Sequence, residues 1–418
     1  MNALLPFRKI LLFTAVCFAL TIAAIGIKYL RDKDAVDLCN RITGSRLLAS
    51  KIEPYHYFWK KGDPDFFYNP YETIRGKINS ITAPPSVLLM MQPFVAMNFT
   101  QAKWCWLLFS YLLISASIFL MVQWIPKQEK ILAWTFAVFF FMASMGWLLH
   151  VERGQIYGYY LFLLCGSYYF FRKENFFWSL GFLMVLIWLR LPFIVFLLPF
   201  ASYYKKKTLW FSALFWVLLL AGVTAWGTDF TDWKGYSEAM SEWGKAQITR
   251  ADIFADPQSQ VWQKYLVGKE EGRDYLISNS SLQYLAQYHA KISLAPILLM
   301  SFFVAAAVIV LFLGRKYFSG AKKEMIFLIS FLLYILLECC LPAPRFNYTY
   351  IQWVFPFLLL WPFRDQVGLR KEFYFFCLLG LAMNLGLFFF IPRSMVLGEG
   401  MIFLSFIFGC KKVMNVEL

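Results

Sequence analysis

Long apolar runs recur from one end of the chain to the other, and mostly short polar connections separate them. Many of these runs approach the roughly 20 residues that a helix needs to cross a hydrocarbon core about 30 Å thick. The pattern therefore predicts an all-α, polytopic membrane protein with about 12 transmembrane helices. The predicted spans lie at 10–29, 101–124, 131–150, 156–171, 176–189, 191–204, 208–227, 293–314, 325–341, 350–363, 373–391 and 395–410.

The composition agrees with a membrane protein. Hydrophobic residues make up 60% of the 418 positions and charged residues only 16%, whereas an ordinary soluble domain has roughly 25% charged residues. This composition excludes a disordered chain, a disulfide scaffold and almost any soluble enzyme. The net charge of +15 could indicate nucleic acid, but the basic residues lie mainly in the short connections between apolar runs. Membrane topology explains them, and we expect no nucleic-acid partner.

The basic residues also predict which side of the membrane each connection faces. If the segment 84–99 is not counted as a span, Lys127, Arg172 and Lys323 fall on the same side as the N-terminus. By the positive-inside rule this side is cytoplasmic, so both termini are predicted to be cytoplasmic. Segment 84–99 then becomes an interfacial or partly inserted helix on the outer face. Counting it as a span would reverse the orientation of everything after it.

Two long polar segments, at 30–100 and 228–292, fall on the predicted outer face. Both contain aromatic residues and mixed charges, which favours short helices lying on the membrane. We predict that the chain, 1–418, is a single integral membrane domain and that the first segment is its catalytic loop. Because the cytoplasmic connections are too short to bind an activated nucleotide, an outward-facing enzyme would take its activated group from a lipid carrier.

No motif for nucleotide binding or zinc hydrolysis occurs in the sequence. The three histidines, His56, His150 and His289, are far apart and lack ligand spacing, so a zinc site is not expected. We expect no cofactor, and the sequence leaves open whether a divalent metal ion assists.

The short outer connections carry arginine rather than lysine. One guanidinium group can bind two phosphate oxygens at once, so arginines at these positions are suited to bind a lipid phosphate. The alternative is that the arginine side chains extend to the lipid headgroups. Arg190 is the strongest candidate, because a charge between two apolar runs is costly without a partner. The four arginines are Arg153, Arg190, Arg345 and Arg393.

The acids of the first outer segment are the natural candidates for a catalytic base, and composition does not choose between them. They are Asp32, Asp34, Asp37, Glu53, Asp63, Asp65 and Glu72.

The order of motifs along the chain resembles glycosyltransferase family 87, integral-membrane enzymes of the GT-C type that use polyprenyl-phosphate sugars. Each motif is short, and the resemblance rests on their order over positions 37 to 348. This chain departs from the family pattern at Tyr157, where an Asn is usual, at Arg190, where a Lys is usual, and near Arg345, where a Trp and a His are common. The matching motifs are Asp37-Leu38, Leu47-Leu48, Pro54-Tyr55, Pro84-Pro85 with Pro93, Gly154-Gln155, Arg190 with Pro192, Asn279-Ser280-Ser281-Leu282 and 342–348.

The resemblance implies an inverting glycosyltransferase with Asp37 as the general base. If this stretch is helical, Arg41 and Arg46 follow one and roughly two turns later and would help to keep Asp37 charged. The alternative for Asp37 is an ordinary helix cap. The residues expected around the donor phosphate and lipid are Arg190, Arg345, Gln155 and Tyr348. The residues expected to bind substrate are Asn279, Ser280, Arg153, Asn347 and Tyr55.

The implied reaction moves a mannose, or another hexose or pentose, from a polyprenyl-phosphate donor to a lipid-linked or cell-envelope glycan. The expected partners are this donor, the glycan acceptor and the lipid bilayer. The expected location is a bacterial inner membrane, with the site facing the periplasm or exterior. Two alternatives stay open: a lipid-linked sugar transporter or flippase, and an O-antigen ligase or polymerase that uses diphosphate-linked donors.

Overall fold

The structure is a computed structural model whose described part consists of helices and the loops that connect them. Within that part there is no β-strand, and Lys61 and Asp63 form an isolated β-bridge. The all-α prediction is therefore confirmed. The structure describes residues 4–32, 35–69, 81–201, 206–248, 280–286, 290, 292, 294–318, 323–341, 345–363, 371–386 and 394–416.

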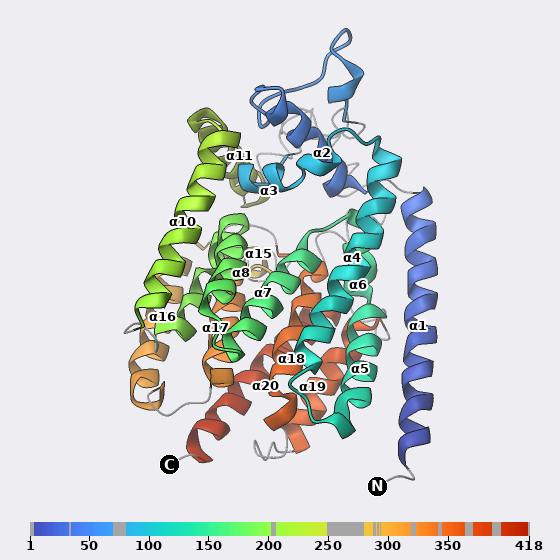
Figure 1. Cartoon of the computed structure of the whole chain (residues 1–418), viewed down its shortest axis with the longest axis vertical. Coiled ribbons are helices and arrows are strands. Elements are labelled where there is room, and N and C mark those ends of the chain that lie inside the picture. The colour runs from blue at the N-terminus through green and yellow to red at the C-terminus, as the bar shows by residue number, and fades with distance from the viewer. Residues whose placement is uncertain are drawn as a thin grey trace.

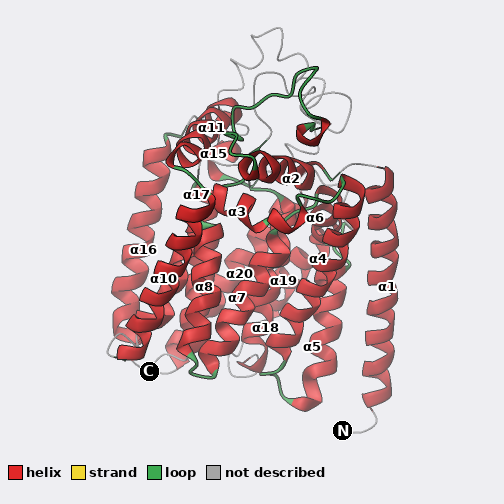
Figure 2. Cartoon of the chain, turned by 45° about the horizontal axis from the view of Figure 1, so that its top comes forward, coloured by secondary structure: helices red, strands yellow, loops and turns green. Residues whose placement is uncertain are grey.

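Upright helices form a bundle, and a layer of shorter helices lies across one of its ends (Figures 1 and 2). The first turn of α1 and the last turn of α20 lie at the opposite end of the bundle (Figure 1). The upright helices include α1 (Leu4–Asp32), α4 (Phe99–Val122), α7 (Tyr157–Arg172), α8 (Phe176–Leu189), α10 (Lys207–Gly227), α16 (Pro296–Phe318), α17 (Lys323–Cys340), α19 (Lys371–Asn384) and α20 (Ser394–Val416). The layer across the end contains α2 (Val36–Ala49), α3 (Pro85–Met90), α11 (Phe230–Ile248) and the single turn α15 (Leu282–Leu285).

Several helices are long and apolar enough to cross a membrane. Among the described residues, three pass by length and composition, namely Pro6–Lys28 within α1, α4 and α10. A fourth is the pair formed by Lys127–Met142 and Met145–Arg153, which is bent by 58°. Shorter apolar helices occur at Phe176–Leu189, Leu191–Phe200, Pro296–Ile309, Phe375–Asn384 and Ser394–Ile407. Helical structure is found at each predicted position, while the number of about 12 crossings stays a prediction.

Two predicted spans are not continuous α-helices. Segment 191–204 consists of a 3₁₀ segment, Leu191–Leu197, followed by the short helix α9 (Leu198–Ala201). Segment 350–363 begins within the 3₁₀ segment Asn347–Trp353, continues as α18 (Val354–Leu360) and ends in 3₁₀ geometry. Prolines explain both, because proline removes a backbone donor and crowds the preceding turn. They are Pro192 and Pro199 in the first segment, and Pro356 and Pro362 in the second.

A third predicted span, 131–150, is also interrupted. Helix α5 (Lys130–Ala137) passes into a π-helical segment, Val138–Met142, and the chain then bends into α6 (Met145–Arg153). The predicted interfacial helix at 84–99 is shorter than expected, because α3 ends at Met90 and a 3₁₀ turn follows it.

The side chain of Arg46 fastens α2 within the upper layer. Its guanidinium group donates to the carbonyl oxygens of Phe66, Val95 and Met97, at 2.6–3.2 Å. It also lies 4.7 Å from the ring centroids of Phe66 and Phe99. This buried arginine is therefore a structural anchor. Its described contacts are with these carbonyls and rings and not with Asp37, so the expectation that it helps to keep Asp37 charged stays a prediction.

Candidate functional site

The carboxylate of Asp37 lies in the first turn of α2, facing the turn that follows α6. The side chain of Arg153 contacts both carboxylate oxygens, with Nε 2.7 Å from Oδ2 and Nη2 3.1 Å from Oδ1. The amide nitrogen of Gln155 also donates to Oδ2. The two charged side chains keep partial contact with solvent, with 18% of Asp37 and 24% of Arg153 exposed. A partly accessible carboxylate held by several donors is suited to a catalytic role at a surface.

Asp37 does not occupy the cap position of α2. The helix begins at Val36, its N-cap residue is Ala35, and no side chain bonds to the cap. As an acid in the first turn, Asp37 is also favoured by the helix dipole. Its principal described partners, Arg153 and Gln155, lie 116 and 118 residues away. The helix-cap alternative is therefore not what its contacts indicate.

Glycine at position 154 lets the end of α6 approach the start of α2. Gly154 ends α6 with a φ of +66°, a left-handed conformation that glycine adopts without strain. A Cβ atom at this position would lie 2.5 Å from the Cβ of Leu38 and 3.1 Å from that of Ala35. The geometry explains the Gly-Gln pair. Gly154 lets α6 approach α2 closely, and Gln155 then reaches the Asp37 carboxylate.

Arg41 completes this network from the next turn of α2. It donates to the carbonyl oxygen of Gly154 at 2.8 Å and to Oε1 of Gln155 at 2.9 Å. Gln155 is 2% exposed, and its side chain accepts from Arg41 while it donates to Asp37. Arg41 thus supports the predicted base through Gln155.

Changing Gly154 to Ala should weaken the packing of α6 against α2 and lower the rate of sugar transfer. The left-handed backbone alone costs about 1–2 kcal/mol with a Cβ present, and α2 must also move away from α6. Thermal unfolding in detergent and a transfer assay measure the two effects. Gly222→Ala in α10 is the control, since a Cβ there would meet nothing within 4 Å, and a helical Ala is favourable. Equal stability of the two variants would contradict the proposed packing role.

Arg190 ends α8 and pairs with a glutamate from α17. Its Nε lies 3.1 Å from Oε1 of Glu338, and Nη2 donates to Oε2. The Glu338 side chain is 3% exposed, whereas 27% of the Arg190 side chain is exposed. The guanidinium carbon lies 5.3 Å from the ring centroid of Tyr157. The accessible part of this ion pair therefore belongs to the arginine.

Tyr157 connects the Asp37 network with the Arg190 pair. It begins α7, two residues after Gln155, and its ring lies 5.4 Å from that of Tyr348. The guanidinium carbon of Arg190 lies 5.3 Å from the centroid of its ring, although Tyr157 was absent from the predicted site. The expected grouping of Arg190 and Arg345 around one donor phosphate stays a prediction.

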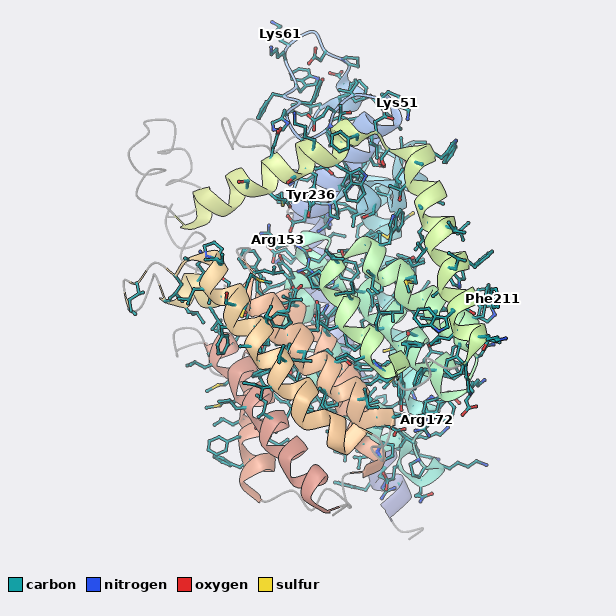
Figure 3. All side chains as sticks on the ribbon, turned by 90° about the vertical axis from the view of Figure 1, so that its left-hand side faces the viewer. Lys51, Lys61, Arg153, Arg172, Phe211 and Tyr236 are labelled. Atoms are coloured by element: carbon teal, nitrogen blue, oxygen red, sulfur yellow. The ribbon has the colours of Figure 1, made fainter. Side chains whose placement is uncertain are left out.

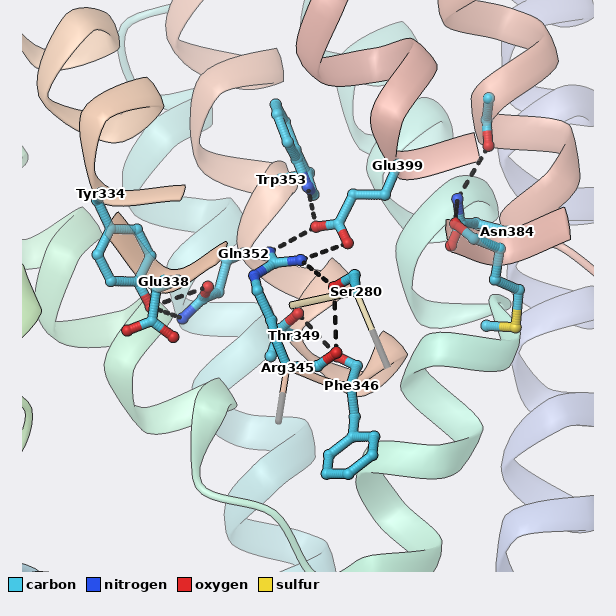
Figure 4. A network of polar contacts seen from close by, with 12 residues as sticks. Ser280, Tyr334, Glu338, Arg345, Phe346, Thr349, Gln352, Trp353, Asn384 and Glu399 are labelled. Carbon is cyan, nitrogen blue, oxygen red and sulfur yellow. Dashed lines mark hydrogen bonds and ion pairs between the residues drawn. The ribbon is translucent and has the colours of Figure 1, made fainter. Parts of the chain in front are cut away.

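Arg345 is held differently from Arg190. It is 3% exposed, and both of its terminal nitrogens contact Glu399 of α20, with Nη2 2.6 Å from Oε1 (Figure 4). Nη1 also lies 3.0 Å from Oγ of Ser280, whose backbone N–H donates to the Arg345 carbonyl at 2.7 Å. The indole of Trp353 donates to Glu399 at 2.7 Å. This cluster joins the second outer segment to the bundle.

Changing Glu399 to Gln should lower the thermal midpoint strongly. Loss of one member of a buried ion pair leaves a buried charge and typically costs about 3–5 kcal/mol. Glu238→Gln is the control, because the Lys234–Glu238 pair is exposed and such pairs contribute about 0–1 kcal/mol. Thermal unfolding in detergent compares the two. A midpoint for Glu399→Gln equal to the control would show that the Arg345 cluster adds no stability.

Of the remaining predicted residues, those that the structure describes are buried or half-buried. Tyr55 is fully buried, and its hydroxyl donates to the carbonyl of Ala83 at 2.7 Å. Asn347 is 5% exposed, and its carbonyl lies so close to Gly146 that a Cβ there would be 2.9 Å away. Tyr348 is half-buried, and Asn279 lies outside the described residues. The roles predicted for these four stay predictions.

Helix α11 covers this region from above. The ring of Tyr236 lies 5.6 Å from that of Tyr55, and the charge of Arg190 acts on its hydroxyl, although burial raises the pKa of Tyr236. On the same helix, burial raises the pKa of Asp232. Figure 3 labels Tyr236 and Arg153 where the upper layer meets the bundle, and Arg172 towards the opposite end. Arg153, with Asp37 bound to it, therefore lies where the upper layer meets the bundle.

Sequence reasoning missed Tyr157 and Glu399 as members of this region. The available signal for Glu399 was an acid inside an apolar run, which predicts a buried partner of opposite charge. The sequence offered no comparable indication for Tyr157, because an aromatic residue in an aromatic-rich helix is usually a packing residue.

Comparison with known proteins gives one family. Searches of curated proteins and of solved structures found no match. The model of glycosyltransferase family 87 matches residues 82–341, more than half of the chain. The matched segment contains Gly154, Gln155, Arg190 and Glu338, while Asp37 precedes it. The resemblance recognised from the motifs is thereby confirmed: the chain belongs to glycosyltransferase family 87 and is a membrane glycosyltransferase.

Proposed function

We propose that this enzyme transfers a sugar from a polyprenyl-phosphate donor to a hydroxyl of a lipid-linked or cell-envelope glycan. The observation that carries the proposal is the segment from Gln155 to Tyr157. One end of it donates to the Asp37 carboxylate, and the other lies against the Arg190 guanidinium. A base for the acceptor and a cation for the donor phosphate are thus neighbours through one short stretch of chain.

In the proposed reaction, Asp37 accepts the proton of the acceptor hydroxyl. A general base must come within about 2.6–3.2 Å of that hydroxyl in the working complex. The acceptor oxygen attacks the anomeric carbon of the donor, and the bond from that carbon to the phosphate oxygen breaks. A single displacement of this kind inverts the anomeric centre. Arg153 and Gln155 fix the direction in which the carboxylate faces.

Arg190 stabilises the departing phosphate group of the donor. The departing polyprenyl phosphate gains negative charge as the sugar leaves, and a preorganised cation at that position lowers the barrier. Guanidinium is suited to phosphate because it donates two parallel hydrogen bonds. We place the polyprenyl tail between apolar helices below the upper layer. Gln155 and Tyr348 would supply neutral contacts near the phosphate, and Ser280, Asn279 and Asn347 contacts to the sugar or acceptor.

We further propose that the upper layer faces the periplasm or exterior of a bacterial inner membrane. Supporting this, Arg172 at the end of α7 lies towards the opposite end of the bundle (Figure 3). Lys323 at the start of α17 pairs with Glu174, two residues after Arg172. The positive-inside rule expects such basic residues on the cytoplasmic face. A substrate carried by a membrane lipid can reach this layer directly, whereas a cytoplasmic nucleotide sugar cannot.

A transfer assay in detergent tests the donor class. Purified enzyme is given radiolabelled polyprenyl-phosphate mannose, glucose or arabinose, with a cell-envelope lipid extract as acceptor. We expect transfer from at least one of these donors and none from nucleotide sugars. Because detergent leaves no sealed compartment, transfer also excludes pure transport. Transfer only from polyprenyl diphosphate-linked oligosaccharides would overturn the proposal in favour of a ligase or polymerase.

A further inference from the structure

We propose that Glu338 is a positioning residue that orients Arg190 towards the donor phosphate. This inference rests on the proposed function, because it gives a role to a residue of the same site. Glu338 lies near the end of α17 and Arg190 at the end of α8, and 148 residues separate them in the sequence. Their meeting is therefore a property of the folded bundle.

The two side chains form a side-on pair. Glu338 binds Nε and Nη2 of Arg190, and this uses two of the five N–H donors of a guanidinium group. Nη1, and the second hydrogen on Nη2, stay on the side away from the carboxylate. Glu338 is 3% exposed and Arg190 is 27% exposed, so the accessible part of the pair belongs to the arginine, and we assign the edge that Glu338 does not occupy to the incoming anion.

Two further contacts restrict the arginine. The face of the Tyr157 ring lies against its guanidinium, 5.3 Å from the centroid. The Arg190 backbone is also fixed, since its N–H donates to the Leu186 carbonyl at 2.9 Å and its carbonyl accepts from Phe193 at 3.2 Å. A flexible side chain is thus held along its length. Such preorganisation lowers the cost of forming hydrogen bonds to a ligand.

The Arg345–Glu399 pair provides an internal comparison. It also joins an arginine to a buried glutamate, but Glu399 binds the two terminal nitrogens of Arg345. Both members are buried, at 3% and 5% exposure, and Ser280 and Trp353 enclose them. Its carboxylate occupies the end of the guanidinium that a phosphate would use. The Arg190 pair leaves part of that end accessible, which makes it the better phosphate ligand of the two.

Glu338→Gln tests the inference. Glutamine keeps the size of the side chain and one acceptor oxygen, but its NH₂ group replaces the second acceptor and the negative charge is lost. The arginine then keeps at most one of the two contacts that fix its orientation. We expect the KM for the polyprenyl-phosphate donor to rise about tenfold. The KM for the acceptor should stay within about twofold and kcat within about threefold. Glu338→Asp, which keeps the charge on a shorter side chain, should give an intermediate donor KM.

A double-mutant cycle separates positioning from a structural role. If Glu338 acts through Arg190, Glu338→Gln should have no further effect on donor KM when Arg190 is already Ala. An undiminished effect in that background would overturn the inference, as would an equal rise in acceptor KM. Glu324→Gln is the matched control, because this carboxylate is also buried but pairs with Arg172, which lies towards the opposite end of the bundle. It should lower the thermal midpoint and leave donor KM within about twofold. A tenfold rise there would also overturn it.

The outcome is distinguishable from failure of the proposed function. If the wild-type enzyme uses only diphosphate-linked donors, the proposed donor class is wrong. The coupling between Glu338 and Arg190 is then measured on the KM of that donor, whose phosphates offer the same oxygen chemistry. Wild-type transfer from a monophosphate donor with an unchanged KM in Glu338→Gln would instead refute the inference and leave the function standing.

Discussion

Replacing Asp37 by Asn is expected to lower turnover by about 10²–10⁴-fold, the usual contribution of a general base. Asparagine has nearly the same shape, so α2 should keep its place above Gly154, while the amide group cannot take a proton from the acceptor hydroxyl. Because the Asp37–Arg153 pair is partly exposed, we expect only a small change in thermal midpoint. Steady-state turnover at saturating donor, together with thermal unfolding in detergent, measures both quantities.

Asp34→Asn is the matched control, since this acid lies three positions earlier in the same outer segment. It should transfer at a near-normal rate. The opposite pattern, with Asp34→Asn inactive and Asp37→Asn active, would show that the base is the other carboxylate. If Asp37→Asn lost activity only in proportion to a loss of folded protein, the role of Asp37 would be structural.

Replacing Arg190 by Ala is expected to lower kcat/KM for the donor by about 10²–10³-fold, as removal of a preorganised donor to a transition-state charge does in other enzymes. Arg190→Lys should recover only part of this loss, because an ammonium group cannot make the two parallel contacts of a guanidinium. Kinetics with varied donor concentration, at fixed acceptor, provide the measurement.

The exposed residue Lys234 of α11 supplies a control for general effects of charge. Lys234→Ala should leave donor kinetics unchanged, since this side chain is 64% exposed and its partner Glu238 is on the same helix. A fall in kcat/KM for Arg190→Ala that matched this control, or full activity of Arg190→Lys, would refute a bidentate phosphate contact at Arg190.

The proline-containing segments show how much of the helical structure could be predicted from the sequence. The apolar runs predict helices at the correct positions, because backbone groups in an apolar environment must bond within their own segment. The predicted spans at 191–204 and 350–363 are nevertheless not continuous α-helices. Proline marks a possible break but does not determine its size, since neighbouring helices decide whether the chain bends or passes through 3₁₀ geometry. In both segments the chain passes through 3₁₀ geometry.

The arginines show the same division within the site. The positions of these arginines in the sequence predict that they bind anions. The sequence does not predict their partners, because each partner is distant along the chain. The ion pairs are Arg153 with Asp37, Arg190 with Glu338 and Arg345 with Glu399, separated by 116, 148 and 54 residues. Arg46, expected beside Asp37, binds three carbonyl oxygens instead.

The helical membrane class, the family and the candidate polar residues thus follow from the order of residues along the chain. The lengths of apolar runs and the order of motifs are recognisable without knowing which helices are neighbours. The burial of each arginine, in contrast, depends on the folded bundle, in which Arg345 is enclosed and Arg190 stays partly exposed. That difference depends on which helix ends meet, and helix packing in a bundle follows from side-chain shapes distributed over the whole chain.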